Sequence, residues 1–170
     1  MKADMLKALA EYNNHANRIL LNAASKLSAE VFANTPSPSR ESAKNLLLHL
    51  IIVEAAYYAR CRGRKFNFDS NADRTFDEIQ KFADETAIEL QRLMDSLSED
   101  DLASQVTAKF GDQSLHLPLW QMLLHTFMHS ARHRGELSIV LSQLGQPLPI
   151  PDLIVQFIDQ SGQTWPFERE

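Results

Sequence analysis

The sequence predicts an all-α protein, a four-helix bundle with a short β-hairpin before the last long helix and a short C-terminal helix. Three observations support this fold class. Four long segments repeat apolar residues at intervals of three and four, the period of one helical face. Around the Gly-Asp dipeptide at 111–112 the pattern alternates instead, as in a hairpin. After Pro147, the stretch PIPDLIVQFID predicts the short final helix.

The first two predicted helices differ in how much of their surface is apolar. The first covers about residues 3–28 and carries a single apolar face. The second contains LLLHLIIVEAAYYARC, and either Ser39 or Ser42 can cap it, because a short hydroxyl accepts a hydrogen bond from an amide that has no helical partner. Since this second helix is apolar on nearly every face, we expect it to lie inside the protein.

The second half of the chain supplies the other two long helices and the hairpin. The third helix is predicted from Thr75 to Leu97, and its many charged residues make it the most exposed of the four. The hairpin follows between Gln105 and Leu119, and the fourth helix starts near residues 118–120 and runs to Leu144. Gly145 offers the left-handed cap that ends this helix.

Composition limits the class of protein. A chain of 170 residues is long enough for one domain over residues 1–170 with its own core. The net charge of −5 argues against nucleic acid as a partner, because binding to phosphates needs a basic surface. A single cysteine, Cys61, excludes an internal disulfide and fits a reducing compartment. Because no apolar run is long enough for a signal peptide or a membrane span, we expect a cytoplasmic protein without a membrane partner.

Six histidines are the main candidates for chemistry, and three of them lie in the stretch HTFMHSARHRGE. Residues four apart on a helix point about 40° apart and are separated by about 6 Å along the axis, so two such imidazoles can bind one metal ion. His125 and His133 are separated by about 12 Å, which is too far for all three histidines of this stretch to share one ion. A third ligand must therefore come from another part of the chain.

The apolar residues of the fourth helix select His129 and His133 as the pair. Both point to a buried side of the helix, where the flanking residues are Met122, Leu137 and Val140. His125 points instead to a more polar sector and is expected to lie beside the site as an outer neighbour. The same reasoning gives His15 and His116 structural roles only.

The third ligand is predicted to be His49, which lies within the most apolar helix. Burying its ring without a partner would cost about 1–3 kcal/mol, and a metal ion would supply that partner. Three neutral histidines without a fourth protein ligand are typical of a catalytic site that keeps one position open. Imidazole ligands favour zinc or nickel, with iron, manganese or cobalt as alternatives.

Two classes of metalloenzyme do not fit these residues. A zincin peptidase needs Glu directly after the first histidine, where this chain has Ser130. A ferritin-like di-iron site needs more carboxylates than Glu54 and Glu136 provide. Glu136 lies three residues after His133 and is the candidate catalytic group, as an acid or base or as a residue that orients a ligand. It could equally form a salt bridge with Arg132 or Arg134.

Three segments of the chain resemble the DinB-like superfamily of metal-binding four-helix bundles. They are YNNHANRILL, LLLHLIIVE and LLHTFMHSARHRGELSIVLSQLG, the last followed by PDLI. The resemblance implies a metal triad at His49, His129 and His133. His15 departs from the pattern, since many relatives carry Trp at that position.

The resemblance also implies an activity. Characterised relatives include metal-dependent transferases that add bacillithiol, mycothiol or glutathione to an electrophile, which makes a small thiol and an electrophile the expected partners. Two alternatives stay open at this point: a metal-dependent hydrolase, and a non-catalytic metal-binding protein of the stress response. The resemblance and the large apolar surface of two helices further predict a homodimer.

Overall fold

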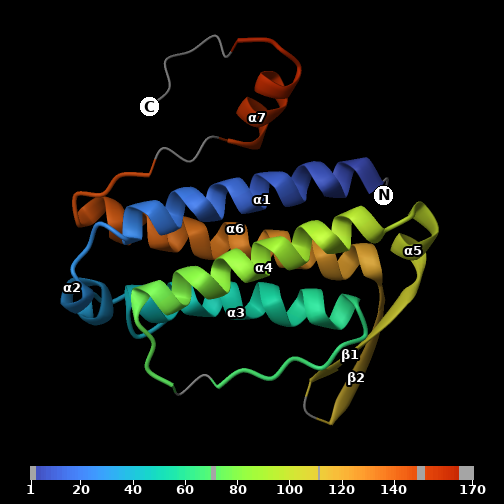
Figure 1. Cartoon of the computed structure of the whole chain (residues 1–170), viewed down its shortest axis with the longest axis horizontal. Helices are drawn as coiled ribbons and strands as arrows, with labels where there is room; N and C mark the ends of the chain where they lie inside the picture. The colour runs from blue at the N-terminus through green and yellow to red at the C-terminus, as the bar shows by residue number, and fades with distance from the viewer. Residues whose placement is uncertain (1–2, 70–71, 111, 149–151, 165–170) are drawn as a thin grey trace.

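Four long helices lie side by side and form the body of the protein in the computed structural model, which describes residues 3–69, 72–110, 112–148 and 152–164 (Figure 1). The four-helix bundle predicted from the sequence is confirmed. Helix α6 packs against α3 and α1, and α4 packs against the same two helices. The bounds of the long helices are Ala3–Ala24 (α1), Ala43–Cys61 (α3), Phe76–Ser96 (α4) and Leu119–Gln143 (α6).

Helices α3 and α4 run in the same direction, so the chain returns along the outside of the bundle between them (Figure 1). Within the described part of this return, Phe66 and Phe68 stack with their ring centroids 6.0 Å apart, and Phe68 also stacks on Phe82 of α4. This connection helps to cover α3, in which no residue is exposed. The expected interior position of the second long helix is therefore confirmed.

Two short helices were not predicted. Helix α2 spans Ala29–Asn34, and helix α5 spans Glu99–Ala103. The first long helix ends at Ala24 rather than near residue 28, because the hydroxyl of Ser28 accepts a hydrogen bond from the amide of Val31 and starts α2. Ser98 starts α5 in the same way, through the amide of Asp101.

The caps of the long helices follow from short polar side chains. Ser42, one of the two predicted candidates, caps α3 by accepting from the amide of Asn45, while Ser39 makes a different contact described below. Thr75 and Glu78 form a reciprocal capping box at the start of α4. Gly145, with φ of 76°, ends α6 as predicted. Helix α4 has the smallest share of buried residues among the four long helices, in agreement with its charged composition.

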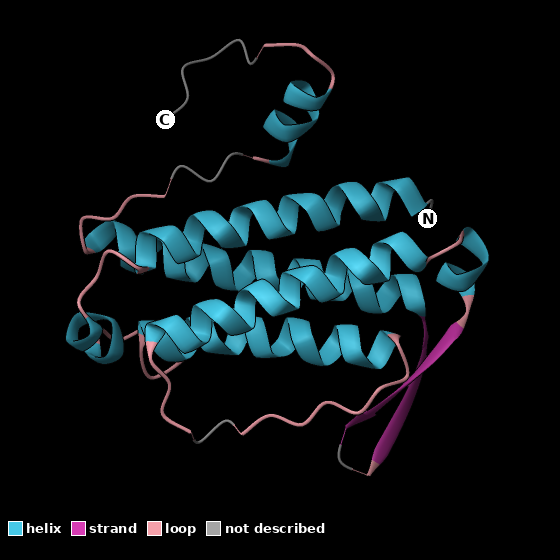
Figure 2. Ribbon diagram, in the orientation of Figure 1, coloured by secondary structure: helices cyan, strands magenta, loops and turns pink. Residues whose placement is uncertain are grey.

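The predicted hairpin is present as the antiparallel strands β1 (Gln105–Phe110) and β2 (Gln113–Pro118), drawn in magenta in Figure 2. Its register pairs Gln105 with Pro118 and Val106 with Leu117. Val106 and Ala108 are buried against one half of the bundle core, so the helices support a hairpin that would be marginal alone. Of the predicted turn, Gly111 lies outside the described residues.

The short C-terminal helix is α7, Leu153–Gln160, as expected, although residues 149–151 of the stretch that predicted it lie outside the described part. Val155 is its buried residue, and the amide of Gln160 donates to Glu11 of α1 at 3.0 Å. None of the helices that the structure describes combines the length and the apolar character needed to cross a membrane.

A buried polar layer divides the core of the bundle into two halves. One apolar cluster includes Leu20, Leu46 and Ile79, and the other includes Tyr58, Leu90 and Leu123. Between them lie four buried polar side chains from three long helices: Asn13, Glu54, Ser130 and Arg134. The last two directly follow the two predicted metal ligands of α6 in sequence, which places this layer at the level of the candidate site.

Candidate metal centre

The three predicted ligands meet between α3 and α6. His49 comes from α3, His129 and His133 come from α6, and one nitrogen of each ring lies within 4.8 Å of the other two. The Nε2 atoms of His129 and His133 are 3.2 Å apart. Two nitrogens that bind one tetrahedral zinc ion at about 2.1 Å are about 3.4 Å apart, so this pair already has the spacing of two metal ligands. His49 completes the cluster from the facing helix, with ring centroids 5.2 and 5.0 Å from those of the pair.

Burial keeps the rings of His49 and His129 neutral at physiological pH. Desolvation, followed by the positive charge of Arg40 and the neighbouring His133, lowers the pKa of His49 to about 4. Desolvation and the neighbouring His133 and His49 also lower the pKa of His129 to about 4. Only a neutral imidazole offers a lone pair to a metal ion, so these rings need not lose a proton before binding one at pH 7.

Glu136 fixes the tautomer of His133. Its Oε2 lies 2.9 Å from Nδ1 of His133, and the hydroxyl of Ser39 donates to the same oxygen. A carboxylate can only accept, so Nδ1 of His133 donates to Glu136, and Nε2, directed at His129, is the ring nitrogen left for a metal ion. Burial raises the pKa of Glu136, but the hydrogen bonds from Ser39 and His133 outweigh this effect and lower it overall. Glu136 therefore orients the ring of His133; that it also transfers a proton in a reaction stays a prediction.

The contacts of His129 also fit a metal ligand. Its Nδ1 is buried without a hydrogen-bond partner among the described residues, and its Nε2 faces only the corresponding atom of His133. A buried imidazole that is satisfied by nothing but another imidazole is costly. A metal ion held by the cluster would give the ring of His129 a stronger partner than a second imidazole, and at His133 the Glu136 carboxylate would then complete the carboxylate–imidazole–ion chain usual at histidine metal sites.

Two arginines lie beside the cluster, and only Arg132 was named from the sequence, as a possible partner of Glu136. Arg132 donates to the second carboxylate oxygen of Glu136 at 3.3 Å, which settles the choice left open between Arg132 and Arg134. Arg40 approaches His49 from the loop before α3, with Nη2 at 2.7 Å from Nε2 and 3.1 Å from Nδ1. No spacing rule could have found Arg40, because the loop that carries it has no regular period.

The other histidines lie outside the cluster, as predicted. His125 is exposed, and its ring centroid is 5.1 Å from that of Tyr57 and 6.1 Å from that of His129. His116 is exposed on β2 and hydrogen-bonds to Thr107, and His15 is half-buried on α1. Burial raises the pKa of Cys61 to about 12, so this thiol stays protonated and unreactive near neutral pH.

A buried hydrogen-bond network next to the cluster fixes how α1, α3 and α6 meet. The Glu54 carboxylate accepts from Ser130 at 2.6 Å, from Asn13 at 2.8 Å, and from Asn17 through both of its oxygens. The carbonyl oxygens of the two asparagines accept in turn from Arg134, at 2.6 and 2.8 Å. Sequence reasoning missed this network, although polar residues four apart within apolar helices, at 13 and 17 and at 130 and 134, were a signal for it.

We expect Glu136→Ala to lower metal affinity by about 10- to 100-fold, the usual cost of removing an outer partner of a metal-binding histidine. Glu136→Gln keeps an oxygen that accepts a hydrogen bond from Nδ1 of His133, so this variant is expected to keep most of the metal affinity that Glu136→Ala loses. Competition for zinc with a chromophoric chelator measures both affinities. Equal affinities for the wild-type protein and both variants would show that Glu136 does not position His133.

Comparison with known proteins agrees with this fold. The sequence profile of the DinB family matches residues 1–161. The structure resembles a DinB-like protein from Bacillus subtilis at a TM-score of 0.61 and 15% identity, covering 81% of this chain and 92% of the other. It also resembles a conserved protein from Enterococcus faecalis at a TM-score of 0.62 and 12% identity, covering 83% of this chain and 96% of the other. No curated protein matches the chain. A profile match over nearly the whole chain, together with these fold neighbours, shows that the chain belongs to the DinB family.

Proposed function

We propose that this protein is a metal-dependent enzyme that transfers a low-molecular-weight thiol to an electrophile, with zinc or nickel held by His49, His129 and His133. The observation that carries the proposal is the composition of the cluster. Within the part of the chain that the structure describes, no further His, Cys, Asp or Glu joins the three histidines. Three protein ligands leave room for a substrate, as in catalytic rather than structural zinc sites.

The chemistry follows from the cluster of three imidazole rings. A divalent ion in such a site lowers the pKa of a thiol that occupies its open position, so that the thiol reacts as a thiolate near neutral pH. The thiol proton goes to solvent, the sulfur forms a bond to the electrophilic carbon, and the leaving group departs with the electron pair of its bond. The protein's own residues hold the geometry: Glu136 orients His133, and the half-buried rings of His49 and His129 limit the access of water.

The contacts of Glu136 favour the transferase over a hydrolase. A hydrolase needs a general base that can reach a water molecule at the open position. Both oxygens of Glu136 are engaged, one by His133 and Ser39 and the other by Arg132. A thiol that is activated by the ion alone has no need of such a base.

The experiment is a titration of the cobalt-substituted protein with glutathione, bacillithiol and mycothiol. We expect at least one thiol to produce a sulfur-to-cobalt charge-transfer band, because the thiolate itself becomes a ligand. Glu136→Gln should keep the band, since all three histidines are retained. His49→Ala should lose both the band and conjugation to a generic electrophile.

The alternatives give different results. A hydrolase would show little affinity for thiols and a strong dependence on Glu136, and a site that only braces the bundle would bind neither thiol nor exchangeable water. Absence of the band with all three thiols, in protein confirmed to contain cobalt, would overturn the transferase proposal.

A further inference from the structure

A groove starts at the histidine cluster and follows one face of α3. Its floor is formed by residues at intervals of three and four along this helix: His49, Ile52, Val53, Ala56, Tyr57 and Arg60. Arg60 follows His49 by eleven positions, which corresponds to about 16 Å along the helix. The volume of the groove is about 520 Å³, within the range of small-molecule sites. The groove therefore has the candidate metal centre at one end and the positively charged guanidinium of Arg60 at the other.

The residues between these two ends are mostly apolar or aromatic. Phe66 and Phe68 come from the connection after α3, and His125 and His129 from α6 face them. Ile52, Val53 and both phenylalanines are only half-buried, so their apolar side chains remain partly open to the groove. No Asp or Glu is among the described residues that line the groove. Such walls favour an apolar ligand body and disfavour a cation.

The end of the groove at Arg60 adjoins further positively charged side chains. The guanidinium of Arg60 lies 5.3 Å from the centre of the Tyr57 ring, on which it stacks. Beyond it, a second hollow of about 660 Å³ shares Arg60 and Phe66 with the groove and is also lined by Lys65, Lys109 and Arg64, of which Arg64 is paired with Glu89 of α4. Again, no carboxylate lines it within the described part of the chain. In a protein of net charge −5, this concentration of positive charge favours an anion.

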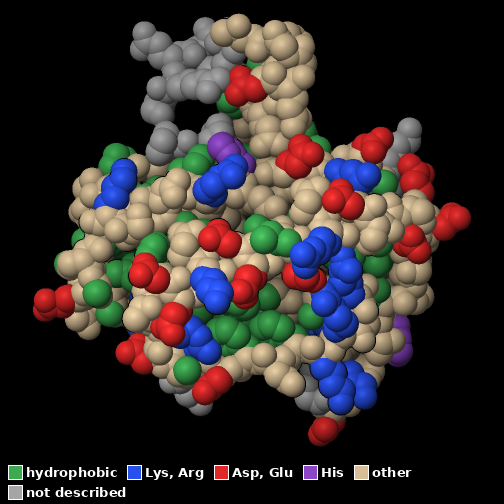
Figure 3. All heavy atoms as spheres, in the orientation of Figure 1, with side chains coloured by type: hydrophobic (Ala, Val, Ile, Leu, Met, Phe, Trp, Pro, Cys, Tyr) green, Lys and Arg blue, Asp and Glu red, His purple; other side chains and the backbone are tan. Residues whose placement is uncertain are grey.

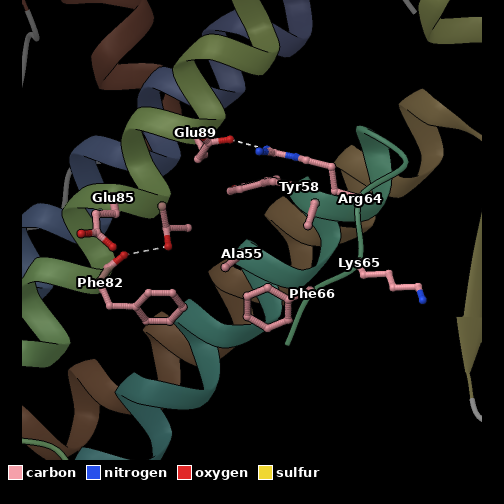
Figure 4. Close-up of a pocket in the computed structure, with 10 residues that line it drawn as sticks. Ala55, Tyr58, Arg64, Lys65, Phe66, Phe82, Glu85 and Glu89 are labelled. Atoms are coloured by element: carbon pink, nitrogen blue, oxygen red, sulfur yellow. Dashed lines mark hydrogen bonds and ion pairs between the residues drawn. The ribbon is translucent and has the colours of Figure 1, made fainter. Parts of the chain in front are cut away.

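The figures show how these side chains are arranged. On the face in Figure 3, Lys and Arg side chains gather near the ends of α3 and α4 that adjoin the hairpin. Figure 4 shows the neighbouring pocket between α3 and α4, where Arg64 reaches Glu89 of α4 and Lys65 points away. The ring of Phe66 lies beside Ala55 and separates this pocket from the groove, since it lines both.

We propose that the groove binds an organic acid with an apolar body, the acid group at Arg60 and the opposite, reacting end beside the histidine cluster. The inference rests on the proposed function in one respect, since it assigns this acid as the electrophilic substrate. Arg60 forms charge-assisted hydrogen bonds to a carboxylate, and the apolar walls exclude water from the rest of the molecule. Arg60 sets specificity and takes no part in the chemical step.

Calorimetric titration with decanoate tests the groove without any thiol. Decyltrimethylammonium, which has the same chain and the opposite charge, is the matched ligand. We expect decanoate to bind the zinc-loaded protein, Arg60→Gln to weaken it at least tenfold, and decyltrimethylammonium not to bind. The control variant Arg92→Gln removes an arginine that pairs with Glu89 and lines neither hollow, so it should bind decanoate like the wild type.

A second variant, Val53→Glu, places a carboxylate within the groove and should abolish decanoate binding. Zinc content and the free energy of unfolding of each variant show whether a loss of binding reflects loss of the fold. Equal affinity for the two ligands, or full affinity of Arg60→Gln for decanoate, would overturn the inference. The cobalt–thiol band is measured without an organic acid, and decanoate binding is measured without a thiol. Each proposal can therefore fail while the other stands.

Discussion

His129→Ala is expected to lower the affinity for zinc or nickel by more than about 100-fold, because the loss of an outer partner alone already costs 10- to 100-fold. His129 is one of two ligands that α6 supplies four residues apart, and its Nε2 lies 3.2 Å from that of His133. Its removal leaves His133 and His49 on different helices with two coordination positions unfilled. Elemental analysis after reconstitution at neutral pH, followed by chelator competition, measures the loss.

His125→Ala is the matched control, since it removes an imidazole from the same helix one turn earlier. The ring of His125 is exposed and outside the cluster, so this variant should keep metal binding within a small factor of the wild type. Complete loss of metal in His125→Ala, with retention in His133→Ala, would mean that the ligand pair is His125 and His129. Absence of metal from the wild-type protein would contradict the metal centre itself.

The histidine pair could be predicted because a helix converts sequence spacing into geometry. Residues 129 and 133 must lie on one face once α6 is helical, and the apolar residues around them identify that face as buried. His49 could be predicted for a related reason, since a polar ring in a helix without an exposed residue needs a partner. Local caps also predicted that α6 ends at Gly145, and they gave Ser42 as one of two candidates for the start of α3.

What could not be predicted depends on contacts between distant parts of the chain. Ser39 was a cap candidate on local grounds, but in the fold its hydroxyl reaches Glu136, which is 97 residues away. The helix α2 begins within a stretch that continues the apolar period of the first helix, so periodicity alone extended that helix too far. The floor of the groove belongs to a helix that the sequence shows as apolar on nearly every face, and only the position of Phe66 and Phe68 shows that one of these faces is open rather than filled.

Glu54→Ala is expected to lower the free energy of unfolding by about 3–5 kcal/mol, the range for breaking a buried charged network by removing one partner. Glu54 is 3% exposed and accepts hydrogen bonds from Asn13, Asn17 and Ser130. Without it, these donors are left unsatisfied in the core, and the charge of buried Arg134 loses its compensating partner. Urea denaturation followed by circular dichroism measures the change.

Glu89→Ala makes the same chemical change at a surface ion pair, where Glu89 binds Arg64 and Arg92. Exposed ion pairs contribute about 0–1 kcal/mol to stability, so the free energy of unfolding of this variant should remain close to that of the wild type.

The comparison of the two variants also bears on the metal centre. Ser130 and Arg134 each follow a metal-ligand candidate by one residue, so their bonds to α1 and α3 fix the rotation of α6 that turns His129 and His133 toward His49. Glu54→Ala should therefore also weaken zinc binding where the protein is still folded, whereas Glu89→Ala should not. A Glu54→Ala protein as stable as Glu89→Ala and with unchanged zinc affinity would show that the polar layer neither stabilises the bundle nor sets the position of the histidines.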